Sequence, residues 1–158
     1  MSSTSLSETR INRILIPTDG SESATRAANV AIEVAKKFGA ELIVLHVIAV
    51  PAGKVAKAEL SPGYDAELKE YFESAHKKAD SIVNEVIRLA EAKDVKTTRL
   101  IQEYSFSVVE TILEQATKNN VDLIVIGTRG LTGFKKLLVG SVSSGVINHA
   151  HCSVLIVR

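Results

Sequence analysis

The sequence predicts an α/β domain in which an open sheet of five parallel strands, in the order 3-2-1-4-5, carries helices on both faces. Two observations lead to this fold class. Apolar runs of strand length alternate with longer segments of helical periodicity along the chain. The apolar runs are nearly continuous, as in parallel strands that are covered on both faces. With 158 residues, 46% of them hydrophobic and 23% charged, the chain is large enough for one such domain.

Five apolar runs are the predicted strands, at residues 11–17, 42–50, 95–104, 121–126 and 152–157. Right-handed crossovers, with two half-sheets wound outward from the first strand, lead to the order 3-2-1-4-5. The run 95–104 alternates in part, which favours a less buried strand at an edge. Ligands bind in such sheets beyond the carboxyl ends of strands 1 and 4, where the order reverses. The turns after these two strands are therefore the candidate site.

Four helices are predicted between the strands, over about residues 22–38, 65–93, 107–118 and 140–150. We expect Ser21 to cap the first helix and Gly39 to end it in a left-handed conformation. The second helix has apolar positions four and three residues apart, as in a coiled-coil seam. Val83 and Ala90 widen this stripe, so we interpret the segment as a crossover helix that packs against the sheet.

The two least apolar segments are expected to lie outside the packed domain. Residues 1–10 are polar and rich in serine and threonine, which predicts a flexible tail ahead of a single domain over residues 11–158. Residues 51–62 contain proline, glycine and charge, which predicts a mobile loop at about residues 51–64.

Composition argues against several classes of protein. The net charge of +1 and the absence of tryptophan favour neither a polyanion partner nor a stacking platform for nucleic acid. The longest apolar run, 42–50, is too short to span a bilayer, and the polar N-terminus does not resemble a signal peptide. A single cysteine, Cys152, suits a reducing compartment. We expect a cytoplasmic protein without nucleic-acid or membrane partners.

Glycines cluster after the fourth predicted strand. Gly127 and Gly130 are three residues apart, and nine residues separate Gly130 from the pair Gly140 and Ser141, which opens a helix. Glycines allow the backbone to approach an anion closely, and the N–H groups of a helix N-terminus attract phosphate. Ser141 and Ser143 would add hydroxyl donors. The segment therefore predicts a phosphate site, although it has no Walker lysine; the alternative is that these glycines only make tight turns.

The turn after the first strand supplies the second half of the predicted site. Asp19 follows this strand, where its carboxylate would accept hydrogen bonds from ribose hydroxyls or the adenine edge. Its alternative role is to form the turn by bonding nearby backbone N–H groups. Val47, at the end of the second strand, is a candidate apolar wall for a base.

Histidines and the cysteine could instead indicate a metal site. His149, His151 and Cys152 lie close in sequence, but a structural zinc site needs four ligands and no second such cluster is present. We therefore predict no metal-ligating residues. We interpret His46 as a hydrogen-bonded histidine near a strand end rather than a catalyst.

These residues resemble the nucleotide-binding branch of the universal stress protein family, over about residues 12–158. The similar segments are ILIPTDGS, the pair His46–Val47, the spacing G-x-x-G-(nine residues)-G-S and the ending HAHCSVLIVR. The resemblance implies a Rossmann-like fold that binds ATP at the switch point, together with Mg²⁺ or Mn²⁺. It also implies a homodimer that pairs its last strands, here residues 152–157. His151 and Ser153 replace the family's usual prolines there, which alters the strand edge.

Carried over by position, the resemblance implies two groups of contacts. Those around adenine and ribose are Pro17, Thr18, Asp19 and Val47. Those along ribose and phosphates are Ile126, Gly127, Gly130, Gly140, Ser141, Val142 and Ser143. Arg129 stands where the family often has histidine, and it either adds positive charge near the phosphates or faces solvent.

The function predicted from these observations is that of an ATP-binding, nucleotide-responsive regulatory protein of the stress response. No general base is recognisable beside the γ-phosphate position, so we predict no catalytic residues and slow or no ATP hydrolysis. Two alternatives stay open: a weak ATPase or phosphotransferase, and a dimeric protein-interaction module with a vestigial pocket. A flavodoxin-like FMN carrier is disfavoured because the phosphate segment follows strand 4 rather than strand 1.

Overall fold

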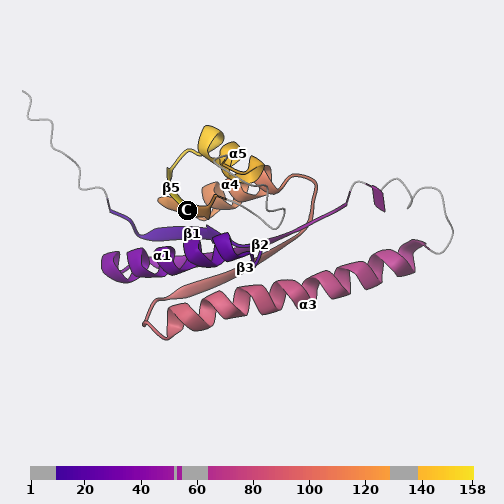
Figure 1. The fold of residues 1–158 in the computed structure, drawn as a ribbon, viewed down its shortest axis with the longest axis horizontal. Helices are drawn as coiled ribbons and strands as arrows, with labels where there is room; N and C mark the ends of the chain where they lie inside the picture. The colour runs from indigo at the N-terminus through magenta and orange to yellow at the C-terminus, as the bar shows by residue number, and fades with distance from the viewer. Residues whose placement is uncertain (1–9, 52, 55–63, 129–138) are drawn as a thin grey trace, which may run out of the picture.

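The computed structural model describes residues 10–51, 53–54, 64–128 and 139–158 (Figure 1). Nine helices and strands alternate along these residues. In chain order they are β1 (Arg13–Pro17), α1 (Glu22–Phe38), β2 (Glu41–Ala49), α3 (Tyr64–Glu91), β3 (Thr97–Ser105), α4 (Val108–Lys118), β4 (Leu123–Gly127), α5 (Ser141–His149) and β5 (Ser153–Val157). Apart from Arg10, Pro51, Gly53, Lys54 and Tyr64, the predicted tail at 1–10 and the predicted loop at 51–64 lie outside the described residues.

The five strands form one parallel sheet in the order β3-β2-β1-β4-β5. The predicted order is therefore confirmed, and β3 lies at an edge as expected. Figure 1 shows α1 and α3 on one face of this sheet and α4 and α5 on the other. Because the chain leaves β1 toward one face and β4 toward the opposite face, the switch point lies between these two strands.

Neighbouring residues of each central strand serve two separate cores. Ile14 and Ile16 of β1 pack among the buried side chains of α1 and α3. Leu15, between them, packs with Ile112 of α4 and Val146 of α5. Since successive side chains of a strand point to opposite faces, a strand buried on both sides must be apolar at every position. This alternation is the physical reason for the continuous apolar runs in the sequence.

The ends of α1 have the predicted caps. Ser21 accepts a hydrogen bond from the Ala24 N–H at 3.1 Å, which satisfies one of the free donors of the first turn. Gly39 has a φ of 65°, and its N–H donates to the Ala35 carbonyl. The start and end of α1 are therefore set by short-range hydrogen bonds.

The long helix α3 is a crossover helix, as we interpreted it. Val83 and Ala90 are buried in the core that also contains Leu42 and Val44 of β2, and Phe72 and Ala79 pack with Ile48 of β2. Strand β1 pairs with β2 only as far as Pro17 and Leu45, whereas β2 and β3 continue as a pair to Ala49 and Ser105. The first half of α3 covers this two-stranded extension (Figure 1).

No helix in the described parts of the chain combines the length and the apolar character that a bilayer span requires.

Candidate functional site

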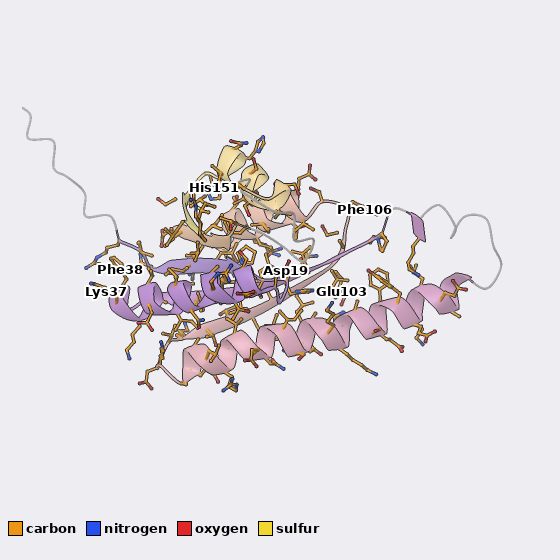
Figure 2. All side chains as sticks on the ribbon, in the orientation of Figure 1. Asp19, Lys37, Phe38, Glu103, Phe106 and His151 are labelled. Carbon is orange, nitrogen blue, oxygen red and sulfur yellow. The ribbon has the colours of Figure 1, made fainter. Side chains whose placement is uncertain are left out.

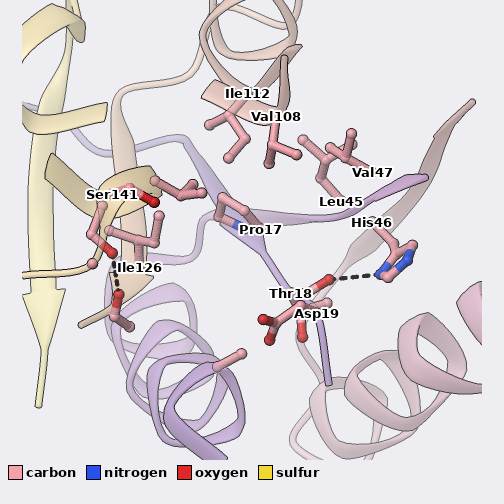
Figure 3. A pocket seen from close by; sticks show the side chains of 15 residues that line it. Pro17, Thr18, Asp19, Leu45, His46, Val47, Val108, Ile112, Ile126 and Ser141 are labelled. Atoms are coloured by element: carbon pink, nitrogen blue, oxygen red, sulfur yellow. Dashed lines mark hydrogen bonds between the residues drawn. The ribbon is translucent and has the colours of Figure 1, made fainter. Parts of the chain in front are cut away.

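A cleft of about 250 Å³ opens beyond the carboxyl ends of β1 and β4, at the switch point of the sheet. Figure 3 shows the side chains that surround it. The lining residues come from three strand ends, from the turn after β1, and from the N-terminal ends of α1, α4 and α5. They are Pro17, Thr18, Asp19, Ala24, Leu45, His46, Val47, Val108, Ile112, Ile126, Gly127, Gly140, Ser141, Val142 and Ser143.

Every predicted site residue that the structure describes lines this cleft. The turn after β1 and the start of α5 are more than 100 residues apart in the chain, yet they face each other across the same opening. Arg129 and Gly130, which were also predicted, lie outside the described residues. The structure thus brings the two predicted halves together, while the contacts they would make with a ligand stay a prediction.

Five lining residues were missed by the sequence analysis: Ala24, Leu45, His46, Val108 and Ile112. Leu45 and His46 directly precede Val47, the residue predicted as an apolar wall for a base. Extending that prediction by two residues along β2 would have included both. Val108 and Ile112 belong to the helix predicted over residues 107–118, which was not considered as part of the site. The available signal was the right-handed crossover from β3, which carries the start of α4 over the carboxyl ends of the strands.

The turn after β1 is held by hydrogen bonds from its own residues. The Thr18 N–H donates to the Leu45 carbonyl at 2.9 Å, and the Asp19 Oδ1 accepts from the Ser21 N–H at 2.9 Å. Gly20 has a φ of +78°, and an added Cβ would lie 2.9 Å from the Ile82 side chain of α3. The turn-forming role of Asp19 is therefore confirmed. Its role toward a ligand stays a prediction, and the bond to Ser21 uses Oδ1.

His46 connects this turn to β2. Its Nδ1 lies 2.8 Å from the Thr18 carbonyl oxygen (Figure 3). A carbonyl oxygen only accepts, so the Nδ1 must carry the proton. Burial lowers the pKa of His46 below its ordinary value, although the Thr18 carbonyl and the Asp19 carboxylate act in the opposite direction. The predicted hydrogen-bonded histidine is confirmed.

The base of the cleft is a slot between apolar side chains. Val108 and Ile112 of α4 face Pro17, Leu45 and Val47 across it (Figure 3). Ile112 and Leu45 are fully buried in the core on this face of the sheet. Such a slot favours a flat, largely apolar group over a charged one.

The opposite end of the cleft is the start of α5. Gly140 is the N-cap residue, and no side chain in the described part of the chain caps this helix. The Gly140 N–H donates to the Thr128 carbonyl at 2.8 Å, which ties the helix start to the end of β4. Ser141, Val142 and Ser143 all line the cleft. The N–H groups of this first turn are thus placed to bind an anion.

The structure corrects the expected role of one residue at this end and adds a packing reason for another. Ser143 was expected to offer its hydroxyl as a donor, but it is buried and its Oγ donates to the Gly127 carbonyl at 2.6 Å. Gly127 was expected to let the backbone approach an anion. That role stays a prediction, and an added Cβ would lie 2.5 Å from Ser23 Oγ and 2.7 Å from Ser23 O. Close packing of α1 on β4 therefore requires a glycine at position 127 whether or not a ligand is bound.

The two histidines near the C-terminus each form a hydrogen bond within the fold. His149 Nδ1 lies 2.9 Å from the Gly145 carbonyl oxygen, and His151 Nδ1 lies 3.3 Å from Thr117 Oγ1. Burial raises the pKa of the Cys152 thiol. Within the described ranges, no three His, Cys, Asp or Glu side chains are grouped as a metal site would need.

Known proteins resemble the chain over nearly its whole length. The model of the universal stress protein family matches residues 10–158. Universal stress protein MJ0531 of Methanocaldococcus jannaschii is 39% identical over 153 residues, which cover 96% of this chain and 84% of that protein. Among solved structures, hypothetical protein MJ0577 has a TM-score of 0.72 at 28% identity, with 93% of this chain and 95% of that one covered. A universal stress protein in complex with cAMP has a TM-score of 0.64 at 25% identity, with 94% and 98% covered.

Proposed function

This chain belongs to the universal stress protein family, and we propose that it binds ATP in the switch-point cleft as a nucleotide-responsive regulatory protein. The observation that carries the proposal is the chemical asymmetry of the cleft. One end is an apolar slot, and the other is the uncapped N-terminus of α5. An aromatic base joined to a chain of phosphates has the same asymmetry. The cAMP complex of a similar structure supports an adenine nucleotide.

The backbone of Val47 supports recognition of the base. The Leu45 carbonyl points toward β1, where it accepts the Thr18 N–H. Alternate residues of a strand direct their N–H and C=O to the same side, so those of Val47 also point toward β1. Because β1 pairs no further than Leu45, the Val47 groups reach the cleft instead of a neighbouring strand. They would offer one donor and one acceptor to the edge of an adenine ring.

The polar end supports binding of the ribose and the phosphates. The Asp19 carboxylate lines the cleft and is suited to accept hydrogen bonds from ribose hydroxyls. The phosphates would lie at the start of α5, where the N–H groups of Ser141, Val142 and Ser143 and the helix dipole favour negative charge.

Among the residues that the structure describes, no cluster of ligands forms a dedicated site for the divalent cation proposed with ATP. Mg²⁺ and similar ions with nucleotides are bound largely by phosphate oxygens and water. We therefore assign no residue of this chain to the ion.

We propose that the protein holds ATP with slow or no hydrolysis. Asp19 and His46 are the titratable side chains among the described lining residues, and the turn after β1 uses both. Hydrolysis requires a group that positions a water in line with the γ-phosphate. Single-turnover assays check this: ATP recovered intact after hours is the expected result, and steady release of phosphate would favour the weak ATPase.

Isothermal titration with ATP, AMP and GTP, each with Mg²⁺ or Mn²⁺, tests the proposed function. We expect ATP to bind and GTP to bind much more weakly, because the guanine edge presents donors and acceptors in a different pattern. If no adenine nucleotide binds under these conditions, the proposal is wrong, and an interaction module with a vestigial pocket becomes the better description.

We also propose a cytoplasmic homodimer that pairs β5 of each subunit. In the described sheet β5 is an edge strand, and its Leu155 is partly exposed. The Val157 carbonyl accepts the Thr128 N–H, so the backbone groups of Val157 point toward β4. Successive residues of a strand direct these groups to opposite sides, so the Val154 N–H points away from β4. Val154→Pro removes this outward donor. Sedimentation should show a dimer for the wild type and a shift toward monomer for the variant.

A further inference from the structure

His46 lies at the point where β1 leaves the sheet. The last paired residues of β1 and β2 are Pro17 and Leu45, and the Thr18 N–H continues the pattern by donating to Leu45 O. In a regular parallel ladder the next bond would join the Val47 N–H to the Thr18 carbonyl. The described backbone does not make that bond. The Thr18 carbonyl accepts from His46 Nδ1 at 2.8 Å instead (Figure 3).

The His46 side chain thus bonds the carbonyl that the Val47 N–H would use in a regular ladder, and it satisfies this carbonyl without the ladder bond. Thr18 is only 6% exposed, so its carbonyl cannot be left without a partner at little cost. With the imidazole in place, the carbonyl is satisfied and the Val47 N–H stays available on the cleft side. Without the imidazole, the simplest rearrangement is that the Thr18 carbonyl accepts the Val47 N–H. This bond extends the ladder between β1 and β2 and draws Thr18 toward Val47.

The charge state of His46 agrees with this geometry. Burial lowers the pKa of His46, which favours the neutral ring with a single proton. The carbonyl partner places that proton on Nδ1. Asp19 and Lys78 are the charged side chains that act on the ring, with opposite effects on its pKa.

We propose that His46 is a positioning residue of the nucleotide site, which holds the Thr18 carbonyl through Nδ1–H and so keeps the Val47 N–H facing the ligand. This role rests on the proposed function, because the ligand whose contact it prepares is the adenine nucleotide. It goes beyond the proposed function because it assigns a role to a residue that contacts the backbone of the site and not the nucleotide.

Two amide substitutions separate the roles of the two ring nitrogens. The side-chain nitrogen of asparagine is two bonds from Cβ, as is Nδ1 of histidine, whereas that of glutamine is three bonds away, as is Nε2. His46→Asn therefore keeps a donor for the Thr18 carbonyl, and His46→Gln and His46→Leu do not. By titration calorimetry we expect His46→Asn to retain most of the ATP and AMP affinity. We expect the other two variants to bind about tenfold more weakly.

A second measurement follows the Val47 amide without any nucleotide. In the wild type and His46→Asn this N–H should exchange with solvent readily for its position in a strand. In His46→Gln and His46→Leu it should become protected, because it then pairs with the Thr18 carbonyl. Long-range ¹H–¹⁵N spectra of the wild type should show His46 protonated at Nδ1.

His76 is the matched control. It is also half-buried, and it pairs with the carboxylate of Glu103 in β3, which is labelled in Figure 2. His76 does not line the cleft. His76→Asn and His76→Gln should leave both the nucleotide affinity and the Val47 exchange unchanged. Unfolding curves of all variants identify any loss of affinity that reflects only a smaller folded fraction.

The outcomes are distinguishable. If the wild type binds no adenine nucleotide, the proposed function fails, and the exchange data alone decide whether His46 controls the ladder. If the wild type binds and all three His46 variants bind equally well, the positioning role is wrong while the function stands. Equal loss in His46→Asn and His46→Leu, or a proton on Nε2, would overturn it as well.

Discussion

On the β1 and β2 side, the cleft is lined mainly by apolar side chains and by a turn that side chains hold in place, whereas on the α5 side it is lined by the backbone N–H groups of an uncapped helix start. Asp19 and His46 bond the turn after β1, and Val47 faces Val108 of α4 across the apolar slot. Across the cleft, the start of α5 has no side-chain cap. The β1 and β2 side is suited to select a ligand by its shape, and the α5 side is suited to select a ligand by its charge. Four changes test this division.

The largest effect is expected at the end of β4. Gly127→Ala places a Cβ 2.7 Å from the Ser23 backbone oxygen, and a backbone atom cannot move aside as a flexible side chain can. We expect the free energy of unfolding to fall by about 2 to 3 kcal/mol, measured by urea denaturation. Gly53→Ala is the control, because nothing described lies within 4 Å of its added Cβ. Equal stability of Gly127→Ala and wild type would contradict the packing role.

The apolar side is tested by Val108→Asp. Val108 is the first residue of α4 and half-buried in the cleft wall, and an aspartate is tolerated in the first turn of a helix. A base that enters the slot would have to desolvate the new carboxylate. We expect the affinities for adenosine and for ATP to fall together, each by about tenfold or more. A loss confined to ATP would show that the wall does not contact the base.

The charge-selecting side is tested by Ser141→Asp. This exposed residue opens α5, so the substitution adds negative charge where the phosphates are proposed to lie without removing a buried group. ATP affinity should fall by about fivefold, and adenosine affinity should not change. Ser141→Ala is the control for loss of the hydroxyl, and it should have the smaller effect. Equal losses for adenosine and ATP would break the division between the two sides.

The smallest effect is expected from pH. The pKa of His46 is lowered in the folded protein from an ordinary value of 6.5, so the unfolded chain binds the proton more readily. The contribution of His46 is therefore fully present above pH 6.5 and declines as the pH falls toward the folded-state pKa. Urea unfolding of wild type and His46→Asn between pH 7.5 and 5.5 should show a steeper decline for the wild type. Parallel curves would count against this linkage.

The fold was predictable because the information it needs is local. Ser21 and Gly39 set the ends of α1 through neighbours in the sequence, and continuous apolar runs identify strands covered on both faces. The strand order followed from crossover handedness. The start of the second helix differs by one residue and its end by two, because helix ends depend on weak terminal bonds.

The site was predictable in outline and not in its contacts. Carboxyl ends of neighbouring strands must meet, so Asp19 and Gly140 could be placed at one cleft from the strand order alone. The bond from Ser143 to Gly127 and the contact of Gly127 with Ser23 depend on how closely two helices approach one strand. The bond from His46 to Thr18 requires knowing where β1 stops pairing. None of these distances can be predicted from the spacing of residues in the sequence.

The crowding at Gly127 also bears on how relatives of this protein should be sorted. A relative that binds no nucleotide would still need glycine at this position, since the neighbour that crowds an added Cβ is Ser23 of the same chain and not a ligand. The first glycine of the G-x-x-G spacing therefore marks inheritance of the scaffold. Positions that have room for other side chains, such as the exposed Ser141 at the mouth of the cleft, can change in relatives that bind no ligand there. Divergence at those positions is the better record of which lineages kept the ligand.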